Sequence, residues 1–88
     1  MKFCVYMILS KKGDSFFSYV GYTSNLDKRL KLHNSSKGAK YTKGKKWKII
    51  YTKYYSSKSI ALKEEYKLKK DYKLRKKLKN IYLDNVKI

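Results

Sequence analysis

The chain has 88 residues, of which 24 are lysine or arginine and six are aspartate or glutamate, so its formal net charge is +18. Its single cysteine, Cys4, excludes an intrachain disulfide and a zinc site built from several thiolates. The longest apolar run, Phe3 to Leu9, is far shorter than the roughly 20 residues that span a bilayer, and it lacks a signal-peptide cleavage site.

The first part of the chain is typical of a β-hairpin. The segment Phe3 to Leu9 is rich in β-branched and aromatic residues and predicts a buried strand. Lys11 to Ser15 has turn composition, and Phe16 to Tyr22 predicts the second strand. Gly21, near the end of that strand, indicates a bulge or a close approach of another group to the backbone.

A helix is predicted to follow the hairpin. Ser24 is expected to be its N-cap, with Asp27 closing a capping box. Leu26 and Leu30 are four residues apart and place one face inward as far as about His33.

The second half predicts a loop, a strand and two helices. Lys37 to Lys46 contains two glycines and many lysines, and we expect a loop. Trp47 to Tyr55 predicts the third strand, and helices are expected at about Lys58 to Lys70, capped by one of the preceding serines, and at Lys73 to Leu83, with Leu74, Leu78 and Ile81 on one side. The predicted fold is α+β, in the order β-β-α-β-α-α, with a small antiparallel sheet flanked by helices in a single domain over residues 1–88.

The charge predicts a polyanionic partner, which we expect to be DNA or RNA. A membrane surface is the weaker alternative, suggested by the basic amphipathic stretch over residues 67–83. Only Arg29 and Arg75 are arginine, whereas 22 residues are lysine. If lysine is the default cation of an AT-rich genome, an arginine marks a place where a planar, always-charged group is needed, which draws attention to Arg29.

Five residues suggest phosphodiester chemistry when they are taken together. Tyr6 and Tyr19 lie on the two strands of the hairpin, Arg29 and His33 share one helical face, and Glu65 lies on the second helix. Hydrolysis needs a proton acceptor, cations around the phosphate and usually a carboxylate-held metal. Each residue also has an ordinary structural explanation, such as a core tyrosine, a solvated arginine, a surface histidine, or a Glu65 that pairs with the lysine four residues on.

The order of motifs resembles the GIY-YIG nuclease superfamily, specifically its small single-domain members. Cys4-Val5-Tyr6 and Tyr19-Val20-Gly21 are similar to the two signature tripeptides, and residues 19–34 continue the pattern with an asparagine-leucine pair and Arg-x-x-x-His. The segments Lys37 to Thr42 (KGAKYT) and Ala61 to Glu65 (ALKEE) resemble the basic loop and the metal-binding segment. The sequence departs from the pattern at Cys4-Val5, and it has no proline before Trp47.

The resemblance implies a role for each of the five residues. Tyr6 corresponds to a general base for water, Tyr19 to a residue that positions water or phosphate, and Arg29 to the cation at the scissile phosphate. His33 corresponds to a proton relay, and Glu65 to the ligand of one divalent metal, Mg²⁺ or Mn²⁺, with Glu64 as the fallback.

The resemblance therefore implies a metal-dependent DNA endonuclease in a prokaryotic cytoplasm, associated with the nucleoid through DNA and without an obligate protein partner. Unpaired bases stacking on Tyr41 and Trp47 would favour single-stranded or branched DNA over duplex. A non-catalytic nucleic-acid-binding module is the alternative. The pathway, DNA repair included, stays open. The expected DNA contacts are Lys37, Lys40, Tyr41, Lys43, Lys45, Lys46, Trp47 and Lys69.

Overall fold

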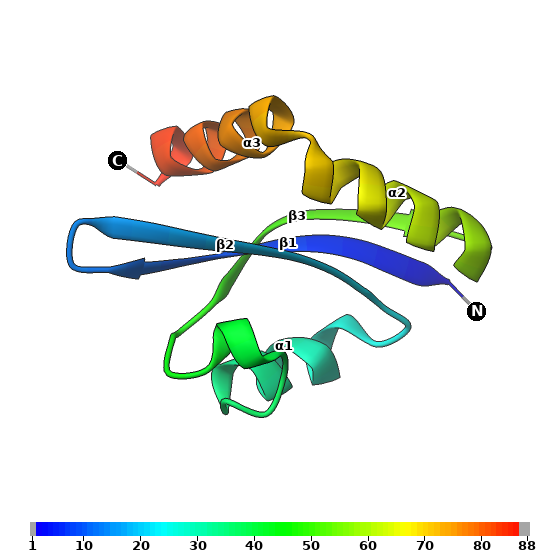
Figure 1. Cartoon of the computed structure of the whole chain (residues 1–88), viewed down its shortest axis with the longest axis horizontal. Coiled ribbons are helices and arrows are strands. Elements are labelled where there is room, and N and C mark those ends of the chain that lie inside the picture. Colours follow the sequence, from blue (N-terminus) through cyan, green and yellow to red (C-terminus); the bar gives the residue numbers. More distant parts are fainter. Residues whose placement is uncertain (1, 87–88) are drawn as a thin grey trace.

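Three antiparallel strands form one sheet in the order β2-β1-β3 (Figure 1). The strands are β1 (Phe3–Lys12), β2 (Ser15–Thr23) and β3 (Lys48–Tyr55) in a computed structural model that describes residues 2–86. The hairpin is longer than the apolar runs suggested, because pairing continues to Lys12 and Ser15. Gly13 makes this tight turn possible, since its φ of 61° lies in the left-handed region.

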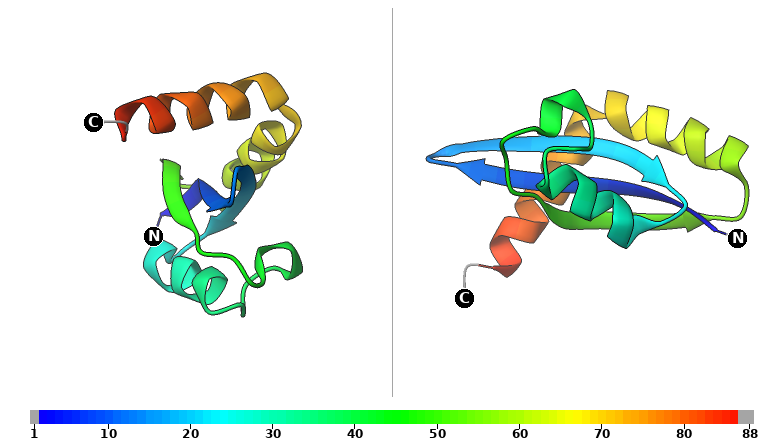
Figure 2. Two further views of the ribbon diagram at one scale, coloured as in Figure 1. Left: turned by 90° about the vertical axis from the view of Figure 1, so that its left-hand side faces the viewer. Right: turned by 90° about the horizontal axis from the view of Figure 1, so that it is seen from below.

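Helices cover both faces of the sheet, and the predicted order β-β-α-β-α-α is confirmed. Helix α1 (Leu26–Asn34) packs on one face, while α2 (Lys58–Lys70) and α3 (Tyr72–Asn85) cross the other (Figures 1 and 2). A short 3₁₀ turn, η1 (Lys40–Thr42), lies within the predicted loop. Within residues 2–86, no helix combines the length and the apolar character needed to cross a membrane.

The central strand β1 supplies the core on both sides. Its residues Cys4 to Ser10 are all buried. Alternation sends Cys4, Tyr6 and Ile8 toward α1 and Trp47, and it sends Val5 and Met7 toward Ala61 and Leu68 of α2. Tyr6 therefore points into the space between the sheet and α1.

The cap of α1 differs from the sequence prediction. Asn25, not Ser24, is the N-cap, and its side-chain oxygen accepts from the Lys28 amide at 3.1 Å. The Asn25 amide in turn donates to the Thr23 hydroxyl at 3.1 Å, which fixes the entry into the helix one residue later than expected. Ser57 caps α2 by accepting from Ile60, as the run of serines suggested.

The inward face of α3 also differs from the prediction. Leu78 packs against the core, but Leu74 and Ile81 are 38% and 48% exposed. The half-buried row instead includes Arg75. The position of Asp71 explains which residues of α3 face inward. Asp71 ends α2 and caps α3 by accepting from the Leu74 amide at 3.0 Å. The start of the helix at this residue sets the direction in which each later residue points.

Candidate active site

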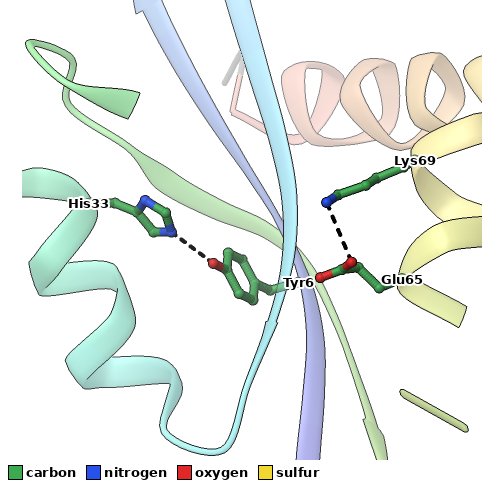
Figure 3. Close-up of polar contacts among 4 residues, drawn as sticks. All are labelled: Tyr6, His33, Glu65 and Lys69. Carbon is green, nitrogen blue, oxygen red and sulfur yellow. Dashed lines mark hydrogen bonds and ion pairs between the residues drawn. The ribbon is translucent and has the colours of Figure 1, made fainter. Parts of the chain in front are cut away.

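Tyr6 and His33 form the buried centre of the candidate site. The Tyr6 hydroxyl lies 2.7 Å from His33 Nε2, across the space between β1 and α1 (Figure 3). Their exposed fractions are 1% and 0%. Bulk water therefore does not compete for this contact, and the proton between the two atoms is shared by these side chains alone.

The hydrogen bonds around His33 identify its tautomer. His33 Nδ1 lies 3.0 Å from Thr42 Oγ1, and that hydroxyl donates to the Ala39 carbonyl at 2.8 Å. A threonine hydroxyl carries one proton, so it must accept from Nδ1–H of the ring. In a neutral imidazole, Nε2 then carries the free lone pair, and the Tyr6 hydroxyl donates to it.

Burial keeps both members of the pair uncharged. Burial lowers the pKa of His33, and the positive charge of Arg29 lowers it further. Burial also raises the pKa of Tyr6, although the nearby Arg29 guanidinium opposes this shift. The resting pair is a neutral phenol donating to a neutral imidazole.

Tyr19 and Arg29 complete the cluster on this face of the sheet. Tyr19 on β2 lies against His33, with ring centroids 5.1 Å apart. The nearby tyrosine hydroxyls favour the positive charge of Arg29 and raise its pKa, Tyr6 more strongly than Tyr19. The structure thus brings together the four residues that the two tripeptides and the Arg-x-x-x-His pattern predicted.

Gly21 and Gly38 have no side chains, which leaves room for Tyr6 and His33. A β-carbon on Gly21 would meet the Tyr6 hydroxyl at 2.5 Å, and one on Gly38 would collide with Nδ1 of His33. The close approach predicted at Gly21 is therefore present, whereas the irregularity of the sheet lies elsewhere, between Met7 and Ile8 in the pairing with β3.

Glu65 lies on the other side of the β2 ribbon from His33 (Figure 3). It forms an ion pair with Lys69 at 3.4 Å, and its negative charge contributes to the raised pKa of Tyr6. Glu64 pairs with Lys67 at 3.1 Å and borders a hollow that contains Tyr51, on the β3 side. The two neighbouring carboxylates therefore face different surroundings, and Glu65 is the one near the tyrosines.

The residues present fit a weakly held hard cation. Within residues 2–86, no group of three or more histidine, cysteine, aspartate or glutamate side chains is placed to hold a metal. A single carboxylate such as Glu65 suits Mg²⁺ or Mn²⁺, which keeps several waters and takes further oxygens from a substrate phosphate. The donor set does not suit zinc, which prefers several nitrogen or sulfur ligands.

The basic loop places an exposed aromatic ring beside Tyr19. Tyr41 is 50% exposed and stacks on the Tyr19 ring, with centroids 6.3 Å apart and planes 21° apart. Lys45 lies over both the Tyr41 ring, at 5.3 Å, and the Phe17 ring, at 4.9 Å. An aromatic and cationic surface therefore extends from Tyr19 along one face of β2.

Trp47 is a correction to the expected DNA contacts. It is 3% exposed, because its ring fills the core between the sheet and α1, and it cannot stack on a base from there. Its Nε1 donates to the Thr42 carbonyl at 3.0 Å, and its amide donates to Asn34 Oδ1 at 2.6 Å. Trp47 therefore holds Thr42, the residue that orients His33. The sequence pattern did not predict this role for Thr42, although Thr42 lies in the KGAKYT segment.

Comparison with known proteins gives one family and a set of bacterial relatives. The model of the GIY-YIG catalytic domain matches residues 2–79. The chain is 47% identical over 51 residues to the UPF0213 protein OB0043 of Oceanobacillus iheyensis, a match that covers 57% of this chain and only 59% of that relative. It is 38% identical over 71 residues to a UPF0213 protein of Bacillus pumilus, covering 80% and 69% of the two chains.

Among solved structures, the chain is similar to the solution NMR structure of the UPF0213 protein BH0048 from Bacillus halodurans. The identity is 39%, the match covers 99% of this chain and 89% of that one, and the TM-score is 0.48.

Proposed function

The chain belongs to the GIY-YIG family of nuclease domains, and on this premise we propose that it is a metal-dependent endonuclease that hydrolyses phosphodiester bonds in DNA. The observation that carries the proposal is the buried Tyr6 hydroxyl, which donates to the free Nε2 of His33. A donor aligned on a neutral imidazole is one proton transfer away from a tyrosinate, which is a base strong enough to activate water.

In the proposed reaction His33 takes the phenolic proton, and Tyr6 then accepts a proton from the attacking water. The water oxygen bonds to phosphorus as the bond from phosphorus to the leaving oxygen breaks, and the leaving oxygen takes a proton from solvent, to which His33 later releases its own. With ordinary pKa values near 10 and 6.5, the first transfer costs about 5 kcal/mol, which fits within the roughly 17 kcal/mol barrier of one turnover per second. Burial widens the gap between the two pKa values. Arg29 stabilises the tyrosinate and so lowers the pKa of Tyr6, but it also lowers the pKa of His33. Arg29 also faces the phosphate, whose charge grows in the transition state.

Glu65 would hold the divalent cation, Mg²⁺ or Mn²⁺, which would supply charge stabilisation at the leaving oxygen. Tyr19 lies between the Tyr6–His33 pair and the Glu65–Lys69 pair, since it contacts His33 and lies 6.0 Å below Lys69 Nζ. This position suits a residue that orients the phosphate or the water.

The proposed substrate is DNA with unpaired bases, either single-stranded or branched. Tyr41 is exposed and stacked on Tyr19, so a base next to the scissile phosphate can stack on it. Such contact requires a base that is free of its partner. The relatives named above are bacterial proteins, and the proposed location, in a bacterial cytoplasm on nucleoid DNA, follows from the proposed DNA substrate.

The test is cleavage of labelled single-stranded, duplex and flap DNA of one sequence, each with Mg²⁺, Mn²⁺ or EDTA. We expect metal-dependent cleavage that Glu65→Gln abolishes and that the matched neighbour Glu64→Gln leaves within about twofold. Equal loss in both glutamate variants would remove the assignment of the metal to Glu65. Equal rates on all three substrates would overturn the preference for unpaired bases.

A non-catalytic nucleic-acid-binding module is the second candidate, and the net charge of +18 favours it independently of the site. It predicts tight, salt-sensitive binding with no cleavage on any substrate or metal. Such a result, obtained with a protein whose thermal unfolding is cooperative, would replace the endonuclease proposal.

A further inference from the structure

Arg75 occupies an unusual position for a charged side chain. It lies on the half-buried face of α3, turned toward the edge strand β2. There it lines a hollow of about 210 Å³ together with Ser18, Tyr19, Val20 and Lys69. The hollow therefore opens beside the Tyr19 of the candidate active site, on the side away from Arg29.

Arginine is rare in this chain, and both arginines lie close to Tyr19. Lysine supplies 22 of the 24 basic residues, and Arg29 already contacts the tyrosine cluster from α1. Arg75 borders the same tyrosine from α3. An arginine in a chain that otherwise uses lysine suits a place where a planar group must bind two oxygens of a phosphate at once.

The Arg75 guanidinium group has an unsatisfied donor. Its Nε is buried and has no hydrogen-bond partner in the described part of the chain, although its guanidinium lies 5.7 Å from the centre of the Tyr72 ring. A buried donor without an acceptor is unfavourable, so the guanidinium group of Arg75 retains unused capacity to donate to an acceptor. The residues that border the hollow include no carboxylate, although Lys69, one of these residues, pairs with Glu65 at 3.4 Å.

The surroundings of Arg75 are positive over a longer stretch of β2. A smaller adjoining hollow is bordered by Ser18, Arg75, Lys76 and Lys79. Together the two hollows offer three kinds of donor, namely a guanidinium, ammonium groups and the Ser18 hydroxyl. These are the donors that bind phosphate oxygens in nucleic-acid complexes.

We propose that Arg75, Lys69 and Ser18 form a second phosphate site, which binds the phosphate of the DNA strand that neighbours the scissile one. The proposal rests on the endonuclease function, since that function places the scissile phosphate at Tyr19. The strand then follows the unpaired edge of β2. Its phosphates contact the α3 side of this edge, and its bases contact the Tyr41 and Phe17 rings on the α1 side.

Binding without cleavage tests the site directly. Fluorescence anisotropy in EDTA measures the affinity for a labelled single-stranded oligonucleotide of about 12 nucleotides. We expect Arg75→Gln to weaken binding roughly tenfold and to make the negative slope of log K against log salt shallower by about 0.7. Lys77→Gln removes the same charge from an exposed position of α3 and is the matched control, expected to change affinity less than about threefold.

Equal effects of Arg75→Gln and Lys77→Gln would overturn the proposal, because charge alone would then account for the loss. Arg75→Lys is expected to restore only part of the affinity, since an ammonium group does not make the paired contact. Ser18→Asp tests the same hollow without altering α3, and unchanged affinity in this variant would also count against the site. Wild-type cleavage with Mn²⁺ is measured separately, so an inactive protein would remove the endonuclease function while the binding comparison still decides the site.

Discussion

Thr42 holds His33 in the tautomer that leaves Nε2 free to accept the Tyr6 proton. The Thr42 hydroxyl donates its one proton to the Ala39 carbonyl at 2.8 Å, so it accepts from the imidazole Nδ1–H at 3.0 Å. Trp47 holds the Thr42 backbone in turn. The basic loop therefore does more than carry lysines, because it sets the chemistry of a residue on α1.

Thr42→Val removes the acceptor of the Nδ1 proton while keeping the shape of the side chain. The ring then shifts toward the tautomer protonated on Nε2, which cannot accept from Tyr6. We expect the cleavage rate to fall about 10- to 100-fold, and the free energy of unfolding to fall by about 1–3 kcal/mol, the cost of a buried polar group without a partner. His33 is the only histidine, so ¹⁵N chemical shifts of labelled histidine report the tautomer without overlap.

Thr42→Ser keeps the hydroxyl and is the matched control, expected to retain the tautomer and most of the activity. If Thr42→Val shows an unchanged histidine spectrum together with full activity, the hydroxyl does not control the tautomer.

The lowered pKa of His33 predicts a loss of stability in acid. The unfolded chain binds a proton on this histidine near its ordinary pKa of about 6.5, but the folded chain binds it only at a lower pH. The free energy of unfolding therefore decreases as the pH falls below about 6.5 and through the folded pKa, and it is fully retained above 6.5. Cleavage is expected to fall over the same acidic range, because protonated His33 cannot accept from Tyr6.

Urea unfolding at a series of pH values measures this dependence, and NMR titration of the single histidine gives its folded pKa. His33→Gln removes the titrating group, so its stability should depend less on pH in this range. A folded pKa at or above 6.5 would contradict the buried, neutral imidazole.

Gly21→Ala is expected to displace the Tyr6 hydroxyl, because the new β-carbon would lie 2.5 Å from that oxygen. We expect at least a tenfold loss of cleavage, since the proton acceptor on His33 no longer faces its donor. Gly13→Asn at the hairpin turn is the control, because nothing lies near its β-carbon and asparagine tolerates a φ of 61°. Equal activity in the two variants would show that Tyr6 does not need this position.

Much of the fold and the centre of the site could be predicted from local patterns. Alternation in β1 and the i, i+4 spacing of Arg29 and His33 depend only on regular geometry, so the residues that they bring together followed from the sequence. The phase of α3 did not follow, because the shared Asp71 cap sets it, and this left Arg75 unrecognised. The burial of Trp47 was not predicted either, since it depends on how the loop that contains η1 folds back on α1.

Tyr41→Ala tests whether unpaired bases stack beside the active site. Tyr41 is 50% exposed and lies on Tyr19, so its removal should cost about 1–3 kcal/mol in binding to single-stranded DNA, which is roughly 5- to 150-fold in Kd. Binding to duplex DNA of the same sequence should change less than about threefold, because paired bases cannot reach the ring and the phosphate contacts remain. Tyr54→Ala is the matched control, since Tyr54 is 54% exposed on β3, the opposite edge of the sheet. Anisotropy in EDTA measures these affinities. If Tyr41→Ala weakens binding to single-stranded and duplex DNA equally, Tyr41 does not stack on an unpaired base. If Tyr41→Ala and Tyr54→Ala weaken binding equally, no particular tyrosine receives the base.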